Sequence, residues 1–170
     1  MRTSISIEMD APPERVFELA RDVRRWPRLL PHYRRVSVAA ERHGHVVAQM
    51  VAVRAFGPLR VPVTWRAEQW SEDSDPDDLR LHFRHIRGVT RGMDVTWHIR
   101  PSGGGGGGGG GADRSAVVTI EHDFRRSLPL VGDRLLPAFV DRVFTRPIAG
   151  RTLAAFKRLA ESDRVSGTND

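Results

Sequence analysis

From Tyr33 to about Arg126, apolar and polar residues alternate in short segments that follow one another with few residues between them. This two-residue period is typical of β-strands that bury one face. Because the connecting segments are short, neighbouring strands are expected to pair in an antiparallel meander. One more alternating segment lies near the N-terminus. The predicted strands cover residues 3–10, 33–41, 46–54, 59–70, 79–86, 92–100 and 116–124.

Helical patterns flank this meander on both sides. Residues 11–23 predict a helix with a proline pair in its first turn, and residues 21–30 predict a second short helix. A residue that precedes proline disfavours helical geometry, so Trp26 is expected to be extended, with the helix broken or starting again there. Residues 131–162 predict a long helix with an apolar stripe and a kink at Pro147.

The length of 170 residues matches one domain with a sizeable core. We expect a single domain over residues 1–162 and a flexible tail over residues 163–170. An unbroken glycine run at 103–111 lies between two strand patterns and predicts a flexible hairpin loop over residues 101–114. No Gly-Lys-Ser/Thr sequence and no helix follow the glycines, so this segment is not a phosphate-binding loop.

Composition narrows the possible functions. The chain has no cysteine, which excludes disulfides, thiol catalysis and cysteine-type zinc sites, and it has no nucleotide-binding or metal-binding motif. We therefore expect no metal and no cofactor. The net charge is +6, but the arginines are scattered among acidic residues, so we expect no nucleic-acid partner. An arginine-driven interaction with nucleic acid or an anionic membrane stays open as a minor alternative.

The sequence has no apolar run long enough to cross a bilayer, and its N-terminus lacks the apolar region of a signal peptide. We therefore expect a cytoplasmic protein that is not stably inserted in a membrane. Its expected oligomeric state is a monomer or a homodimer.

Strand alternation also assigns side chains to the two faces of the sheet. Trp65 and Trp97 fall on apolar faces and, with Trp26, are candidates for one interior, either as packed core or as the walls of a cavity. Gln69 and His122 are polar residues on the same apolar faces. A buried polar group needs a partner from the protein, from water or from a ligand, so these two residues are the best polar-site candidates.

Four segments resemble the polyketide cyclase/dehydrase branch of the START-like (Bet v 1-like, SRPBCC) superfamily. The first is "APPERVFELARDVRRWPRLLPHYRRV", with an Ala-Pro helix start, then Trp-Pro and then an aromatic residue. The segments "GMDVTWHIRP" and "AVVTIEHDF" resemble the last two strands of that branch, and "TLAAFKRLAE" resembles the end of its long helix. The likeness covers about residues 3–161.

The resemblance implies an α+β helix-grip fold. In this fold a seven-stranded antiparallel sheet wraps around a long C-terminal helix, two short helices follow the first strand, and an elongated cavity lies between the sheet and the long helix. The aromatase/cyclases of this branch promote aldol ring closure and dehydration of poly-β-ketone chains. The resemblance therefore implies a hydrophobic small-molecule ligand that is polyketide-like, lipid-like or quinone-like.

Residue by residue, the resemblance places Trp26 and Tyr33 at the cavity mouth, and Trp65 and Trp97 on its walls. Gln69 stands where those cyclases carry an arginine, which removes a fixed cation that could hold a developing enolate. Two functions stay open: a cyclase/aromatase and a non-catalytic carrier. The candidate catalytic residues are His122, Tyr33 and Gln69. The candidate ligand-binding residues are Trp26, Tyr33, Trp65, Gln69, Phe83, Met93, Trp97, His122, Phe139 and Val143.

Overall fold

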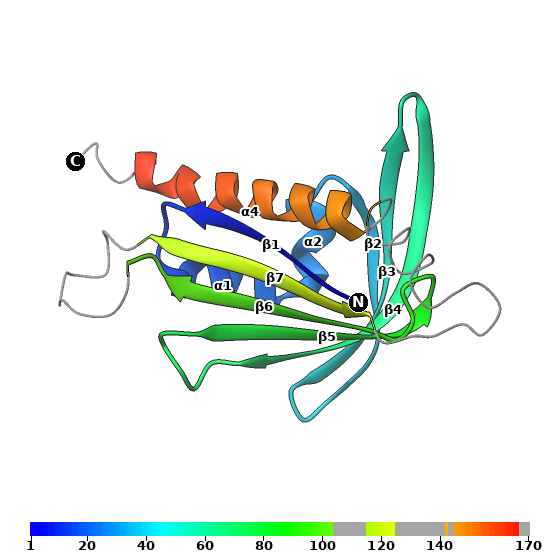
Figure 1. Ribbon diagram of the computed structural model, residues 1–170, viewed down its shortest axis with the longest axis horizontal. Coiled ribbons are helices and arrows are strands. Elements are labelled where there is room, and N and C mark those ends of the chain that lie inside the picture. The colour runs from blue at the N-terminus through cyan, green and yellow to red at the C-terminus, as the bar shows by residue number, and fades with distance from the viewer. Residues whose placement is uncertain (104–114, 125–141, 143–144, 167–170) are drawn as a thin grey trace.

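A computed structural model describes residues 1–103, 115–124, 142 and 145–166 of the chain (Figure 1). Two candidate ligand-binding residues, Phe139 and Val143, lie outside the described residues. So do most of the predicted glycine-rich loop and the end of the predicted tail, residues 167–170.

The seven described strands form one sheet in the order β1-β7-β6-β5-β4-β3-β2, and every neighbouring pair is antiparallel. The predicted seven-stranded antiparallel meander is therefore confirmed, with the N-terminal strand paired to β7. The strands are β1 (Arg2–Met9), β2 (Tyr33–Arg42), β3 (His45–Phe56), β4 (Leu59–Glu72), β5 (Leu79–Gly88), β6 (Met93–Pro101) and β7 (Ala116–Phe124).

Two short α-helices follow β1, as predicted: α1 (Pro13–Arg21) and α2 (Trp26–Leu29), joined by a 3-10 turn. The expectation that Trp26 is extended was wrong, because its φ of −53° and ψ of −40° are helical. A new helix does begin at Trp26. Its carbonyl accepts a hydrogen bond from Leu30 N at 2.7 Å, and its indole Nε1 donates to Ala20 O at 3.0 Å. These bonds and the burial of the indole outweigh the local preference set by Pro27.

The C-terminal helix α4 (Arg146–Ser166) lies along the sheet (Figure 1). Pro147 stands in the first turn of α4, a position that tolerates its missing N–H, and the kink expected at Pro147 stays a prediction because most of the turn before α4 lies outside the described residues. Thr145, just before it, belongs to a wider π-type turn. The helix continues to Ser166, past the boundary expected at residue 162.

The inward sheet face and α4 enclose the core. On β4 to β7, residues that the alternation places on the inward face are buried from Val63 onward, whereas Val61 is half-buried, and their strand neighbours are more exposed. Phe156 and Leu153 of α4 are fully buried against this face. The alternation therefore decides which side of the sheet holds the apolar interior.

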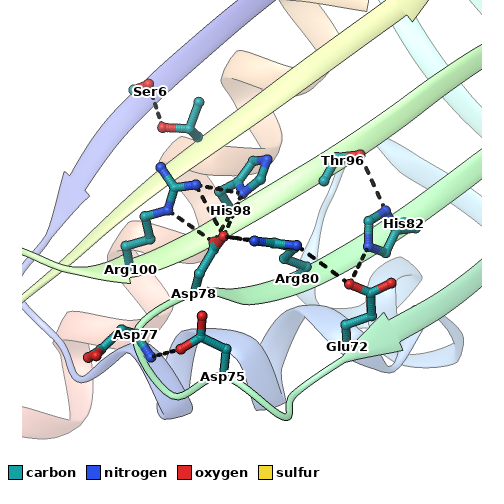
Figure 2. Close-up of polar contacts among 11 residues, drawn as sticks. Ser6, Glu72, Asp75, Asp77, Asp78, Arg80, His82, Thr96, His98 and Arg100 are labelled. Carbon is teal, nitrogen blue, oxygen red and sulfur yellow. Dashed lines mark hydrogen bonds and ion pairs between the residues drawn. The ribbon is translucent and has the colours of Figure 1, made fainter.

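The outer sheet face carries a polar network centred on Asp78 (Figure 2). The Asp78 carboxylate accepts hydrogen bonds from Arg80 and Arg100, and His98 Nδ1 lies 3.0 Å from Asp78 Oδ1. Burial alone would raise the pKa of Asp78, but the hydrogen bonds from these three side chains outweigh it and hold that pKa well below its usual range. The network ties the β4–β5 loop to β5 and β6.

Candidate functional site

A cavity of about 70 Å³ lies between the inward sheet face and the N-terminal part of α4. Its wall combines residues of β2 to β7 with residues of α2 and α4. The structure brings together at this cavity seven of the predicted site residues: Trp26, Tyr33, Trp65, Phe83, Met93, Trp97 and His122. Sequence reasoning missed other lining residues, among them Met50, His85, Thr90 and Ile148.

Trp26 occupies the centre of an aromatic cluster, not the mouth of the cavity. Its side chain is only 3% exposed, and its ring centroid lies 5.0 Å from Tyr33, 5.7 Å from Phe83 and 6.0 Å from both Trp97 and Phe156. Tyr33 is also buried. The expected placement of both aromatics at the mouth was therefore wrong, because α2 folds inward over the sheet.

These packed rings explain why the cavity is small. Pockets that bind small molecules usually measure about 300–1,000 Å³, whereas this one has about 70 Å³. The elongated cavity that was expected is largely filled by aromatic side chains in the described part of the chain. A polyketide-sized or quinone-sized molecule can enter only if some of these rings change rotamer.

Gln69 is buried on β4 as predicted, but it does not line the cavity. Its Nε2 donates a hydrogen bond of 2.8 Å to the carbonyl oxygen of Arg21, the last residue of α1. The side chain therefore satisfies an orphan carbonyl at a helix end and attaches α1 to the sheet. This position corrects the expectation that Gln69 contacts the ligand.

The polar part of the cavity wall is formed by His85, Thr90, His122 and Thr145. His85 stacks on Trp65 with the rings 5.9 Å apart and 4° from parallel, and its Nδ1 lies 2.6 Å from Thr90 Oγ1. Burial, and secondarily the charge of a protonated His122, lower the pKa of His85 to about 3. The imidazole of His85 is therefore neutral at neutral pH.

A usable sequence signal for His85 existed. It continues the inward series of Leu79, Leu81 and Phe83 at two-residue spacing. A β-bulge follows, because Ala67 pairs with His85 whereas Arg66 pairs with Arg87. The extra residue, Ile86, turns the chain before the β5–β6 loop, which brings Thr90 back to His85.

Tyr33 takes part in a second polar group, behind the aromatic cluster. Burial raises the pKa of Tyr33, although a hydrogen bond with Thr152 opposes the shift. Thr152 Oγ1 donates to Ile148 O and lies 2.9 Å from His32 Nε2, so with its one proton committed it accepts from His32. Burial and the nearby Arg151 charge lower the pKa of His32 to about 4.

Within the described residues, no group of three or more His, Asp or Glu side chains is placed to hold a metal ion. None of the described helices is both long enough and apolar enough to span a membrane. Among the described residues, the cavity wall offers aromatic surfaces, two imidazoles and hydroxyl groups.

An antiparallel sheet that grips a C-terminal helix around an apolar cavity defines the helix-grip class of ligand-binding domains. Residues 9–149 match the family of polyketide cyclases/dehydrases and lipid transport proteins. The chain belongs to this family. A comparison with curated proteins finds no match.

Solved structures share the fold. A protein from Thermus thermophilus is 23% identical with a TM-score of 0.66, and the match covers 96% of this chain and 99% of that one. The Zhui aromatase/cyclase from Streptomyces sp. R1128 is 18% identical with a TM-score of 0.66, with 99% and 98% covered. A START superfamily protein from Mycobacterium smegmatis is 13% identical with a TM-score of 0.63, with 95% and 97% covered. At these identities the likeness shows the fold alone, which is the predicted helix-grip, START-like fold.

Proposed function

We propose that this protein binds a hydrophobic small molecule in the cavity between the sheet and α4. The observation that carries the proposal is an aromatic cavity wall whose polar atoms gather at one place, around His85, Thr90 and His122. A few convergent polar groups in an apolar pocket fix the orientation of a ligand. The ligand class that fits is a polyketide-like, quinone-like or lipid-like molecule with an apolar body and a carbonyl or hydroxyl group.

The tryptophans provide the test. Trp26, Trp65 and Trp97 line the cavity, whereas Trp70 stacks between His45 and His82 on the outer face. In a Trp70→Phe protein, all remaining tryptophan fluorescence comes from the cavity. Titration with a naphthoquinone and with a long-chain fatty acid is expected to quench or shift this emission in a saturable way. An unchanged spectrum across such a panel, together with no co-purified ligand in mass spectrometry of extracts, would contradict the proposal.

A second candidate function is promotion of aldol ring closure and dehydration. The observation that favours it is a pair of imidazoles, His85 and His122, in an otherwise apolar cavity. An imidazole of His122 would remove a proton from the carbon between two carbonyls, and the resulting enolate carbon would bond to a ketone carbon of the same chain. The new alkoxide would take up a proton, and loss of water would follow. The cavity would orient the chain and exclude solvent, and Tyr33 would donate a hydrogen bond once its hydroxyl turns away from Thr152.

This candidate is tested in a reconstituted polyketide synthase. The double variant His122→Ala/Tyr33→Phe is expected to shift the products from enzyme-directed cyclised species to spontaneous ones. His45→Ala, which removes an imidazole from the outer face, is the matched control. A product distribution that is the same for native protein, double variant and control would leave the protein as a binder or carrier without this chemistry.

A further inference from the structure

One end of the sheet collects four chain segments. The pairings Arg2↔Asp123 and Met93↔Phe124 place the N-terminus, the start of β6 and the end of β7 together. In an antiparallel meander the β5–β6 and β3–β4 turns lie at this same end. Figure 1 shows the β3–β4 hairpin rising beside the N-terminal end of α4, away from the β4–β5 loop. We call this part of the molecule the hairpin end.

Among the described residues, the exposed large apolar side chains are concentrated at the hairpin end. In the described part of the chain, the hydrophobic side chains between 36% and 62% exposed are Met1, Phe56, Leu59, Ile86 and Val89. Phe56 and Leu59 flank the β3–β4 turn, Ile86 lies near the end of β5, Val89 follows β5, and Met1 lies next to the end of β7. Scattered surface hydrophobics are normal in soluble proteins, but a collection at one end marks an interaction surface.

Arginines surround these apolar tips. The segments 54–60 and 86–92 contain four arginines and no acidic residue: Arg54, Arg60, Arg87 and Arg91. Beside the β3–β4 hairpin, a groove of about 650 Å³ is lined by Arg34, Arg60, Arg151 and Arg158, and no carboxylate of the described residues lines it. The two helical arginines lie seven residues apart on one face of α4, with Ala154 and Ala155 between them.

The groove arginines are uncompensated among the described residues, where none of the four has a hydrogen bond or ion pair through its side chain. On the outer sheet face the situation is different. There Arg80 and Arg100 contact Asp78, and Arg84 lies 3.5 Å from Asp94. Charge pairing is thus available to arginines elsewhere on this surface, and the groove is left cationic.

The opposite end of the sheet carries the acidic β4–β5 loop, with Glu72, Asp73, Asp75, Asp77 and Asp78. There Arg80 and Arg100 are paired with Asp78. Among the described residues, the groove arginines without such pairing and the exposed large apolar side chains therefore occur together at the hairpin end. Such a distribution orients a protein at a negatively charged surface.

We propose that the hairpin end docks reversibly on an anionic lipid surface. The turn residues Phe56, Leu59 and Val89 would enter the interfacial layer, and the groove arginines would contact lipid phosphates. The apolar contacts stand on separate turns, and the cationic groove lies between the β3–β4 hairpin and α4. Separate contact points of this kind suit a deformable lipid surface better than the flat face of a folded partner. This inference is independent of the proposed function, because docking can be measured without any cavity ligand.

The cavity reaches the same end of the molecule. Thr90, in the β5–β6 turn next to Val89, lines the cavity, and so does Thr145 just before α4. A docked molecule would therefore hold its apolar cavity against the lipid phase, from which an apolar ligand would be taken.

Vesicle flotation tests the docking. The full chain is mixed with phosphatidylcholine vesicles or with 3:1 phosphatidylcholine:phosphatidylglycerol vesicles at low and high salt. Binding is expected to the anionic vesicles at low salt and to fall at least tenfold at high salt, because counterions screen the arginines. Little binding to pure phosphatidylcholine is expected.

Two variants separate the contributions of charge and apolar contact. Arg60→Gln/Arg87→Gln is expected to lower the vesicle partition coefficient about 25-fold, or about fivefold for each arginine. Leu59→Ser/Val89→Ser is expected to lower it about tenfold or more. Arg42→Gln, at the opposite end of the sheet, is the matched control and should leave it unchanged. All substituted side chains are exposed, so circular dichroism and thermal melts should match those of the native protein.

The absence of cysteine allows a direct measurement of insertion. An environment-sensitive fluorophore on Leu59→Cys or Val89→Cys should move to a shorter emission wavelength when anionic vesicles are added, and one on His43→Cys should not. Any of three results would overturn the proposal: no flotation of the native protein at low salt, equal losses in the Arg42 control, or binding to polyglutamate or duplex DNA as tight as to vesicles and unaffected by Leu59→Ser/Val89→Ser.

Discussion

The role of the buried Gln69 side chain is determined by its hydrogen-bond partner. Its Nε2 donates to Arg21 O at the end of α1, and it sits on the inward face of β4 without lining the cavity. Alternation along the strand could predict that Gln69 is buried, because alternate residues of a strand point to the same face of the sheet. It could not predict the partner, because the position of α1 over the sheet is set by packing between segments far apart in sequence.

Replacing Gln69 should therefore affect stability and leave ligand binding intact. Gln69→Ala removes a buried side chain and the hydrogen bond that it donates to the Arg21 carbonyl, so we expect a loss of about 1–2 kcal/mol in the free energy of unfolding, measured in urea. Affinity for an apolar probe should stay within about twofold of native, as for an interaction made outside the pocket. The control is Gln49→Ala, because the Gln49 amide donates to Trp65 O at 3.0 Å from a half-buried site where water can replace it. A loss of ligand affinity in Gln69→Ala but not in Gln49→Ala would indicate that Gln69 contacts the ligand.

At the level of elements, the bulge at the end of β5 determines how the polar wall of the cavity is built. The two-residue period of β5 could predict that this segment is a strand and which of its side chains point inward. It could not predict the bulge, because no turn residue marks the bulge before Gly88. After the bulge, Gly88 adopts a φ of +94°, and its backbone lies close to β4. The same region holds the His85–Trp65 stack, so the geometry of the site depends on this close approach.

Gly88 is expected to tolerate no side chain. A Cβ atom there would press on the Thr64 carbonyl oxygen and lie 2.8 Å from Trp65 Cα, and the backbone conformation itself disfavours an L-residue. We expect Gly88→Ala to cost about 2–4 kcal/mol of unfolding free energy. Gly57→Ala is the matched control, because Gly57 also has a positive φ of +57° but has nothing within 4 Å of the added Cβ. That variant should cost only about 1–2 kcal/mol. Equal losses in urea unfolding would mean that the close packing at Gly88 is unimportant.

For the whole molecule, the sheet order and the inward face could be predicted because both follow from consecutive short connections and alternation. The volume of the interior could not. It depends on the rotamers of rings such as Trp26 and Phe83, and on how far α2 folds over the sheet, which the local Trp-Pro preference predicted wrongly. The cationic groove also needed the structure, because Arg60 of β4 comes beside Arg151 and Arg158 only when the β3–β4 hairpin packs next to α4.

The buried histidines make the stability of the whole molecule depend on pH. The folded-state pKa values of His85 and His32 are lowered to about 3 and about 4 from an ordinary value of 6.5. Below about pH 6.5 the unfolded chain therefore binds more protons than the folded chain. The free energy of unfolding is at its full value above about pH 7 and falls as the pH drops below about 6.5. Asp78, whose pKa is depressed, adds a further loss in the same direction as its carboxylate is protonated in strong acid.

Urea unfolding at pH 7 and pH 5 measures this dependence. Between these values we expect the free energy of unfolding to fall by about 2–4 kcal/mol, with His32 contributing less because it is partly exposed. His85→Gln keeps a polar group beside Thr90 but removes the titrating ring, and should reduce the fall by about 1–2 kcal/mol. Thr90→Val removes the hydrogen bond and keeps the imidazole, so it should lower stability at both pH values by a similar amount. If His85→Gln leaves the difference between pH 7 and pH 5 unchanged, His85 is not the buried neutral group that its stacking on Trp65 and its contact with Thr90 indicate.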